Sequence, residues 1–333
     1  MKPVSPDRTV TRPATPQDAE LVSLLINDRI DALRGRRPET AARVRRRWRH
    51  PQFDLLTDSR LVFAPDGALV GYAHIRDVKD PPVDVFGGVA VHPAYDDVPW
   101  LWDDLFGWMG SEARRVIAKA PPDARIALVA GTTQDDAVEQ RELERHGFRY
   151  SRTFHRMAID FPALVAAPST LEGFRIRTVL AGQDDEGIVS AYQEAFADHY
   201  GVLKQPFEVE LAEWRRLMEE DDFDPTLWLV AEEEGKIVGF VTAYAQTPGD
   251  PGRGLIDDLG VRPGWRRRGL GHSLLLHAFR ALAERGKCGA VLAVDTENRT
   301  GAPALYERVG MRSIRASYTY VQELRPGRNL VAT

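Results

Sequence analysis

The chain has almost no cysteine. Cys288 is the single cysteine among 333 residues, so no disulfide can form within the chain. Disulfide frameworks are typical of small secreted domains, and the lack of one agrees with a reducing compartment, which predicts a cytoplasmic protein. We expect Cys288 to be a small buried side chain rather than a nucleophile.

The sequence also lacks long apolar runs and an excess of positive charge. No run approaches the roughly 20 apolar residues of a membrane span, and the first residues have no apolar core like that of a signal peptide. A net charge of −5 and a pI near 6.0 argue against nucleic acid as the main partner. No group of histidine, cysteine and acidic residues has metal-ligand spacing. We therefore expect no membrane, nucleic-acid or metal partner.

What the sequence does contain is a diverged internal repeat. Four pairs of segments match in the same order at nearly the same offset, which is typical of a duplicated domain. The pairs are 17–18 with 183–184, 61–72 with 229–240, 89–95 with 259–265, and 143–149 with 306–312. The second pair has the pattern of a β-hairpin with a glycine in its turn. Each copy predicts strand, helices, hairpin, strand, helix, strand, helix and strand.

A segment rich in alanine, proline, serine and threonine near residue 168 suits a linker between the copies. We expect one domain over residues 1–165 and another over 170–325. A chain of 333 residues is long enough for both. The predicted fold class is α/β, with a mixed sheet in each of two tandem domains.

The second copy carries a glycine-rich loop between a predicted strand (254–261) and an amphipathic helix (271–285). The loop is Arg266-Arg267-Arg268-Gly269-Leu270-Gly271. Unpaired N–H groups and the dipole of a helix N-terminus attract anions, and glycine lets the backbone approach a pyrophosphate. Arginines can neutralise part of the phosphate charge. The loop alone could be a surface turn, but the strand and helix around it favour a phosphate site.

These segments resemble the GNAT superfamily of N-acetyltransferases over about residues 173–323. The matching motifs are Leu259-Gly260-Val261-Arg262-Pro263 through Gly271-His272-Ser273-Leu274, then Asn298 through Ala302, Leu305-Tyr306-Glu307 and Gly310-Met311. The tandem layout is similar to that of mycothiol synthase and related two-domain acetyltransferases of actinobacteria. The resemblance implies two tandem GNAT folds, acetyl-CoA as co-substrate and a small-molecule amine as acceptor.

In that family the strand before the loop splays from its neighbour. The resemblance therefore implies that backbone groups near Leu259 and Val261 pair with the pantetheine amides of CoA. The full set of expected CoA contacts is Leu259, Gly260, Val261, Arg266, Arg267, Arg268, Gly269, Leu270, Gly271, His272, Asn298 and Ala302. Asn298 could instead belong to an ordinary turn.

Tyr306 matches the tyrosine that protonates the leaving thiolate in the family. A phenol with a pKa of about 10 stays protonated at neutral pH and can supply that proton. A tyrosine on an amphipathic helix is also commonly a packed aromatic residue. Asp198 and His199, which follow a helix of the amine-facing region, are candidate substrate contacts, although a lone histidine is more often structural.

The general base is predicted on the strand before the loop. Strand alternation puts Leu255, Asp257 and Leu259 on one face. Several family members carry a glutamate at the position of Leu255, and Asp257 is the nearest substitute on that face. Asp257 could equally make only a structural hydrogen bond, and a base relayed through water stays open. The same alternation puts Asp258 on the other face, so no carboxylate dyad is expected.

The first copy lacks these features. Its loop, residues 93–99, has no glycine and no arginine but two carboxylates, and Leu143 stands in place of Tyr306. Carboxylates there would repel phosphate, and Pro99 removes a backbone donor. We expect a degenerate domain without a normal CoA site. The arginines at 43, 45, 46, 47 and 49 are either a solvated helix face or a wall for an anionic acceptor.

The predicted function is direct transfer of an acetyl group from acetyl-CoA to the primary amine of a small molecule in a ternary complex. The C-terminal domain would be the active one. Mycothiol synthesis is one candidate, but Leu255 departs from the acidic residue of that group. The alternative is a catalytically inactive CoA-binding or scaffolding module. Other acyl groups and the oligomeric state stay open.

Overall fold

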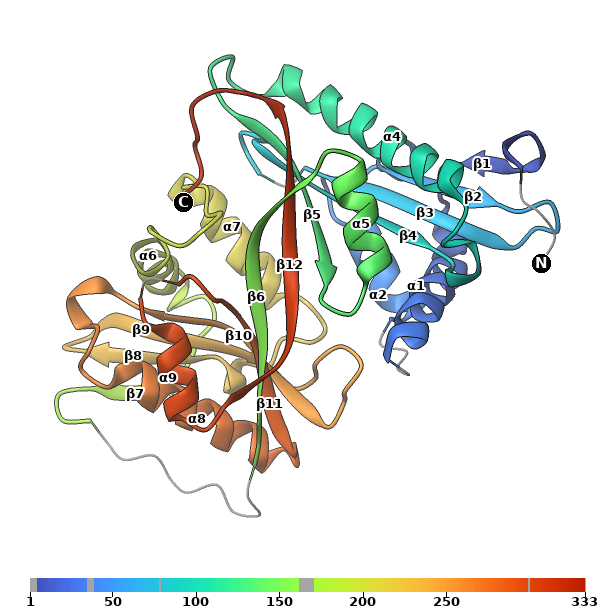
Figure 1. Ribbon diagram of the computed structural model, residues 1–333. Coiled ribbons are helices and arrows are strands. Elements are labelled where there is room, and N and C mark those ends of the chain that lie inside the picture. Colours follow the sequence, from blue (N-terminus) through green and yellow to red (C-terminus); the bar gives the residue numbers. More distant parts are fainter. Residues whose placement is uncertain (1–4, 35–38, 78, 162–170, 299, 333) are drawn as a thin grey trace. The chain divides into compact units, whose positions relative to one another are not determined.

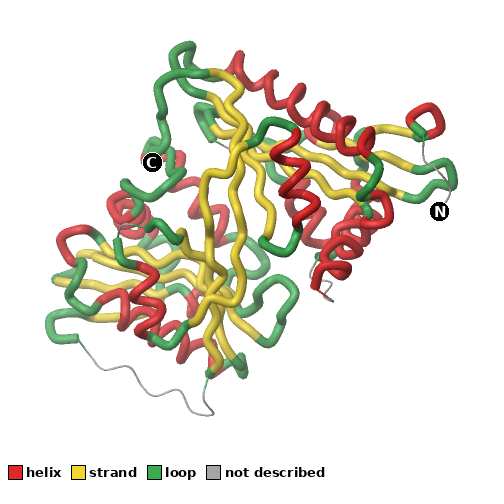
Figure 2. Tube along the Cα trace, in the orientation of Figure 1, coloured by secondary structure: helices red, strands yellow, loops and turns green. Residues whose placement is uncertain are grey.

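The computed structural model describes residues 5–34, 39–77, 79–161, 171–298 and 300–332 (Figure 1). The chain divides into two units, neither of which is continuous in sequence. Unit 1 comprises Met1–Arg152 with Ser317–Leu330, and unit 2 comprises Thr153–Ala316 with Val331–Thr333. In each unit, strands lie together with helices packed beside them (Figure 2). The predicted α/β class with mixed sheets is confirmed.

The helices of unit 1 are α1 (Ala19–Arg34), α2 (Ala41–Trp48), α3 (Leu55–Asp58), α4 (Pro99–Arg115) and α5 (Ala137–Arg145). Its sheet has the order β1 (Val10–Arg12), β2 (Ser59–Phe63), β3 (Leu69–Arg76), β4 (Asp84–Val91), β5 (Ile126–Thr133) and β12 (Arg312–Arg325).

The helices of unit 2 are α6 (Asp185–Ala195), α7 (Phe207–Met218), α8 (Leu270–Glu284) and α9 (Ala302–Arg308). Its sheet has the order β6 (Arg149–Asp160), β11 (Gly289–Asp295), β10 (Arg253–Val261), β9 (Lys236–Tyr244), β8 (Leu229–Glu233) and β7 (Arg175–Thr178). Strands β10 and β11 run parallel, as β4 and β5 do in unit 1. A parallel pair needs a crossover connection, which α8 and α4 provide.

The two units exchange a strand. From Phe154 to Asp160, β6 pairs with β11 of unit 2, although it precedes the linker region. From Ser317 to Arg325, β12 pairs with β5 of unit 1, although it ends the second repeat. Figure 1 shows β12 beside the strands of unit 1. The domain boundary expected at 165–170 overlaps residues outside the described part of the chain. The prediction of two domains that follow each other in sequence did not include this exchange of strands.

Helices cover both faces of the unit 2 sheet because its central strand β9 is apolar on both sides. A Cβ at Gly239 would lie 3.3 Å from Leu274 of α8. The next residue, Phe240, packs its ring 5.6 Å from that of Trp214 in α7. Side chains of successive strand residues point to opposite faces, so α8 and α7 lie on opposite sides of the sheet. Helix α8 therefore lies on the other side of the sheet from the helices α6 and α7.

Two further expectations can be compared with the structure. Within the described residues, no helix combines the length and apolar character needed to cross a bilayer. Cys288 is exposed, with its thiol 3.3 Å from the carbonyl oxygen of Gly252. The expectation of a buried filler was wrong, because Cys288 lies at the start of β11, where the strand emerges from the core.

Candidate active site

Strand β10 carries a β-bulge at the centre of the candidate site. Its pairing with β9 is Ile256 with Ala243 and then Leu259 with Val241, so three steps on β10 match two on β9. The equivalent strand β4 pairs with β3 without such a shift. One extra residue is therefore inserted in β10, at Asp257–Asp258. A bulge re-aims side chains locally and is common beside functional sites.

Beyond the bulge, β10 separates from β11. The two strands pair in parallel only from Arg253 to Leu255. From Leu259 to Val261, β9 is the only strand partner of β10 within the described residues. The opposite backbone edge of this segment can therefore take an extended ligand as a further strand would pair with it. This is the geometry that the pantetheine prediction for Leu259 and Val261 requires.

The glycine-rich loop leads from the end of β10 into the N-terminus of α8. Gly269 precedes the helix with φ +86°, a conformation that favours glycine, and no side chain caps the helix. The first helical hydrogen bond runs from the Ser273 N–H to the Gly269 carbonyl at 3.0 Å. The N–H groups of Leu270, Gly271 and His272 thus have no helical acceptor, which makes them suitable donors to a pyrophosphate.

Gly271 lies close to the second motif. A Cβ built on it would be 3.1 Å from the Leu305 side chain of α9 and 4.0 Å from that of Leu259. The helix start is therefore close to both β10 and α9. Any larger side chain at 271 would enter the space between these elements.

The three loop arginines have different partners. Arg266 donates to the carbonyl oxygens of Val261 (3.1 Å) and Ala195 (2.9 Å), and so ties the loop to β10 and α6. Arg268 pairs with Glu233 at 2.9 Å and lies over the Phe174 ring. Arg267 is exposed, has a φ of +63°, and makes no ion pair or hydrogen bond within the described residues. Arg267 is thus the arginine of this loop whose guanidinium is available to a phosphate.

The charge of Asp258 at the bulge acts on Tyr306. Tyr306 in α9 is only 8% exposed, and burial raises the pKa of its hydroxyl, with the negative charge of Asp258 adding to the effect. Burial, together with the smaller effects of the charges of Asp257 and Glu210, raises the pKa of Asp258 to about 7. A carboxyl that titrates near neutral pH can act as a proton acceptor under physiological conditions.

Further tyrosines lie in the field of the bulge carboxylates. Burial raises the pKa of Tyr192 in α6 and of Tyr244 in β9, and both Asp257 and Asp258 contribute to each shift. Asp257 is exposed, whereas Asp258 is half-buried and donates its backbone N–H to the Thr242 hydroxyl at 3.0 Å. The face of the sheet toward α6 and α7 therefore presents carboxylates framed by aromatic hydroxyls.

The bulge changes the prediction for the base. The assignment of Asp257 and Asp258 to opposite faces depended on strict alternation, and the register shift interrupts that alternation. The two carboxylates instead influence each other, since the charge of Asp257 raises the pKa of Asp258. Sequence reasoning missed Asp258 for this reason.

The remaining predicted residues lie around the same loop and helix. His199 is half-buried, and its Nδ1 lies 3.2 Å from the Tyr200 carbonyl oxygen, whereas Asp198 is exposed and lies 3.8 Å from Arg266. Ala302 begins α9. Asn298 accepts the Thr300 N–H at 2.8 Å through its side-chain oxygen. This bond is the turn role that was the alternative for Asn298, and its amide nitrogen can still donate elsewhere.

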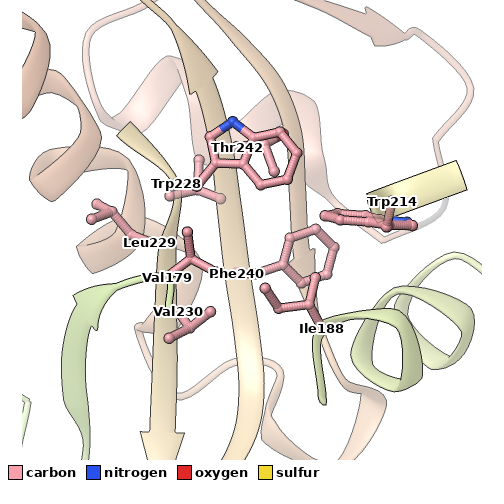
Figure 3. Close-up of a pocket in the computed structure, with 9 residues that line it drawn as sticks. Val179, Ile188, Trp214, Trp228, Leu229, Val230, Phe240 and Thr242 are labelled. Atoms are coloured by element: carbon pink, nitrogen blue, oxygen red, sulfur yellow. The ribbon is translucent and has the colours of Figure 1, made fainter. Parts of the chain in front are cut away.

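The sheet face toward α6 and α7 has a dense aromatic core. The apolar pocket below it is lined by Val179, Ile188, Trp214, Trp228, Leu229, Val230, Phe240, Val241 and Thr242. Figure 3 shows the Phe240 ring extending from β9 toward Ile188 and Trp214. No water-sized space remains among these side chains, so this pocket supports the sheet and is not a ligand site.

The equivalent loop of unit 1 is closed by a buried ion network. Arg29 in α1 is 6% exposed and pairs through two bonds with Asp136, at 2.7 and 2.6 Å. It also pairs with Asp96 of the loop at 2.8 Å and donates to the Val91 carbonyl at 3.2 Å. Asp96 is therefore held in place by a buried guanidinium group.

Comparison with known proteins gives concordant results. The acetyltransferase (GNAT) family pattern matches residues 188–311. A mycothiol acetyltransferase of Thermobispora bispora is 31% identical over 259 residues, covering 76% of this chain and 80% of that protein. One from Salinispora arenicola is 31% identical over 261 residues, covering 78% and 80%.

Solved structures match nearly the whole chain. A GCN5-related N-acetyltransferase from Sphaerobacter thermophilus is 32% identical with a TM-score of 0.81, covering 98% of this chain and 99% of that one. A tandem GNAT protein from the clavulanic acid biosynthesis pathway has a TM-score of 0.70 at 15% identity, covering 96% and 100%. The second likeness concerns the fold alone, and it is a fold with the same tandem arrangement.

Proposed function

The chain belongs to the GNAT family of acetyltransferases, and from this premise we propose that unit 2 transfers an acetyl group from acetyl-CoA to the amine of a small molecule. The observation that carries the proposal is that three features lie at or next to strand β10. These are the unpaired edge at Leu259–Val261, the uncapped start of α8, and the bulge carboxylate Asp258 beside Tyr306.

The pyrophosphate of CoA would bind at the start of α8. The free N–H groups of Leu270, Gly271 and His272 face no competing cap, and Arg267 adds a cation without an internal partner. Arg266 and Arg268 would act mainly by fixing the loop, because their guanidinium groups already bond to the protein. The pantetheine would extend along Leu259 and Val261.

The chemistry follows from the two groups at the bulge. Asp258 would accept a proton from the acceptor ammonium, and the resulting neutral amine would attack the thioester carbonyl so that a C–N bond forms. The C–S bond then breaks, and the second proton that the nitrogen loses would end on the sulfur, so that CoA leaves as the thiol. Tyr306, whose raised pKa keeps its hydroxyl protonated, would donate a hydrogen bond to the sulfur as negative charge develops there. Asp257 would tune Asp258 by its charge, which refines its predicted role as the base.

The acceptor side favours an amine without an attached anion. Asp257, Asp258 and Glu210 put negative charge on this face. The charges of Asp257 and Glu210 raise the pKa of Asp258. An anionic acceptor would meet repulsion there. The arginines of α2, considered as a wall for such an acceptor, belong to unit 1.

The identity of the amine is open within this class. The mycothiol acetyltransferases that resemble the chain make the mycothiol-pathway amine one member of any test panel. Leu255 at the position of an acidic residue argues for a different acceptor. Amine pairs that differ only in an added phosphate or carboxylate test the charge preference, and we expect the member without the anion to give the higher kcat/KM.

Release of free thiol from acetyl-CoA across an amine panel tests the proposal. We expect Tyr306→Phe to slow turnover at least about tenfold and Asp258→Asn about a hundredfold, within the range for proton-transfer groups, while CoA affinity stays within a few-fold. Glu284→Gln, at the far end of α8, is the matched control and should match the unmodified protein. Thermal protection by CoA without thiol release for any amine would instead favour the inactive binding module.

A further inference from the structure

Unit 1 keeps the architecture of the acceptor side although its cofactor loop is closed. In unit 2, Trp214 of α7 packs edge-on to Phe240 of β9, with ring centroids 5.6 Å apart. In unit 1, Trp48 of α2 packs edge-on to Tyr72 of β3 at 6.4 Å, and its indole N–H donates to the Tyr72 hydroxyl at 3.1 Å. The same two elements thus build the same aromatic floor in both units.

The strand registers define which residues correspond above this floor. His74 pairs with Gly88 on β4, two positions from Tyr72, as Thr242 stands two positions from Phe240. A Cβ at Gly88 would lie only 2.6 Å from the His74 ring, so the imidazole covers the glycine. At the equivalent place in unit 2 the bulge carries Asp257 and Asp258. An imidazole has replaced the carboxylates.

The surrounding groups differ in charge as well. Arg76, at the end of β3, corresponds to Tyr244, and Arg47 on α2 corresponds to Glu213 by the offset of the repeat. Both arginines act on His74, since burial, Arg47 and Arg76 together lower the pKa of its imidazole to about 3. The place that is acidic in unit 2 is therefore basic in unit 1.

Within the described residues, this positive charge is compensated only in part. Arg76 is half-buried and has neither an ion pair nor a hydrogen bond there, and burial together with the charge of Arg47 lowers its pKa. Arg47 shares a single carboxylate, Glu39, with Arg43, at 2.8 and 3.4 Å. The Nδ1 of His74 is buried and has no hydrogen-bond partner.

Such an arrangement is unfavourable unless an anion completes it. Removing a cation from water is costly when no counter-charge is near, and a buried polar nitrogen without a partner adds to that cost. Guanidinium groups bind carboxylates and phosphates through two parallel hydrogen bonds. Neutral imidazole with its proton on Nδ1 can donate a further bond. These three groups together match a small oxyanion.

We propose that unit 1 binds a small oxyanion, the phosphate or carboxylate group of a ligand, between Arg47 and Arg76 with His74 as a third donor. This site is separate from the loop at Asp96, and it differs from a solvated helix face because two of its three groups come from strand β3. It would give the first unit a ligand of its own, independent of the acetyl transfer proposed for unit 2.

Thermal unfolding of the full chain tests this proposal. CoA is added first at saturation so that the start of α8 is filled, and inorganic phosphate, citrate or chloride is then compared at pH 7 and equal ionic strength. We expect phosphate or citrate at about 10 mM to raise the Tm by a few degrees above chloride, as binding to the folded state requires. A rise with phosphate alone would identify a phosphoryl ligand, and a rise with citrate alone a carboxylate.

Variants locate the effect. Arg76→Gln should lose the anion-dependent rise, and its Tm in chloride should equal or exceed that of the unmodified protein, because an uncompensated charge has been removed. A purely structural arginine would lower it. Arg115→Gln, a surface arginine of the same unit, is the control and should keep the rise. No rise with either anion, or a full rise in Arg76→Gln, would overturn the proposal.

Discussion

In the proposed reaction, the carboxyl group of Asp258 is the group that accepts the proton. Its pKa is raised to about 7 first by burial and then by the charges of Asp257 and Glu210. A base must be ionised before it can accept a proton, so activity should rise with pH through this pKa. Because the charge of Asp257 contributes to this pKa, removing it should change the pH at which activity rises.

Asp257→Asn should therefore move the acidic limb of the kcat/KM profile to lower pH, because removing a neighbouring negative charge lowers the pKa of Asp258. The measurement is kcat/KM from pH 5 to 9 with one acceptor amine for both proteins, so that titration of the amine cancels in the comparison. Glu284→Gln should leave the limb unmoved. If Asp257→Asn moves the limb upward or not at all, Asp258 is not the group that titrates.

At this scale the sequence supported Tyr306 and not Asp258. Tyr306 belongs to a contiguous motif on one helix, so its position can be read from the spacing of the motif. Asp258 depends on one inserted residue in β10. The offset between the repeats changes from 168 at the hairpin to 170 at the following strand, which signals inserted residues without locating the bulge. Burial, which sets the pKa, is a property of the folded neighbourhood and cannot be obtained from local pattern.

Among the elements, the start of α8 carries the proposed CoA site. The strand, the loop and the helix were predicted from their patterns, and the structure has them at 253–261 and 270–284. The partners of the loop arginines were not predictable. Arg266 and Arg268 bond to Ala195 and Glu233, which lie 71 and 35 residues away in the sequence. Only the folded chain shows that Arg267 remains available.

Gly271→Glu should weaken CoA binding at least about a hundredfold. Its Cβ would lie 3.1 Å from Leu305, and its carboxylate would repel the pyrophosphate at moderate effective dielectric. Calorimetric titration with CoA measures the loss, and the Tm without CoA shows whether the variant is folded. Gly264→Ala is the matched control, because a Cβ there meets nothing within 4 Å. Binding retained by Gly271→Glu would place the pyrophosphate elsewhere.

Across the whole molecule, the two units have opposite charge at equivalent places. In unit 2 the loop residue Arg266 donates to Val261 and to Ala195 of α6. In unit 1 the arginine is on the helix, as Arg29, and the loop residue is Asp96. The loop charge that would face a phosphate has thus been reversed, and the strand-end carbonyl keeps an arginine donor in both units.

We therefore predict one CoA per chain. The buried pairing of Arg29 with Asp96 and Asp136 would have to break before unit 1 could accept a pyrophosphate, and breaking a buried pair costs about 3–5 kcal/mol. Calorimetry with the full chain gives the stoichiometry directly. Gly271→Glu provides the control, since it should reduce the count to none. Two CoA molecules per chain, or one that persists in this variant, would contradict a single site in unit 2.

Because the two units exchange strands, the order in which the ribosome produces the chain affects when each sheet can be completed. The sheet of unit 1 lacks its β12 edge until Arg312–Arg325 has left the ribosome, after the other described strands of both units. Residues 170–325 produced alone would lack the β6 partner of β11 and would carry β12 without β5. Exposed strand edges promote aggregation. Each sequence half therefore needs a strand from the other half to complete its sheet, and either half produced alone is expected to keep an unpaired strand edge.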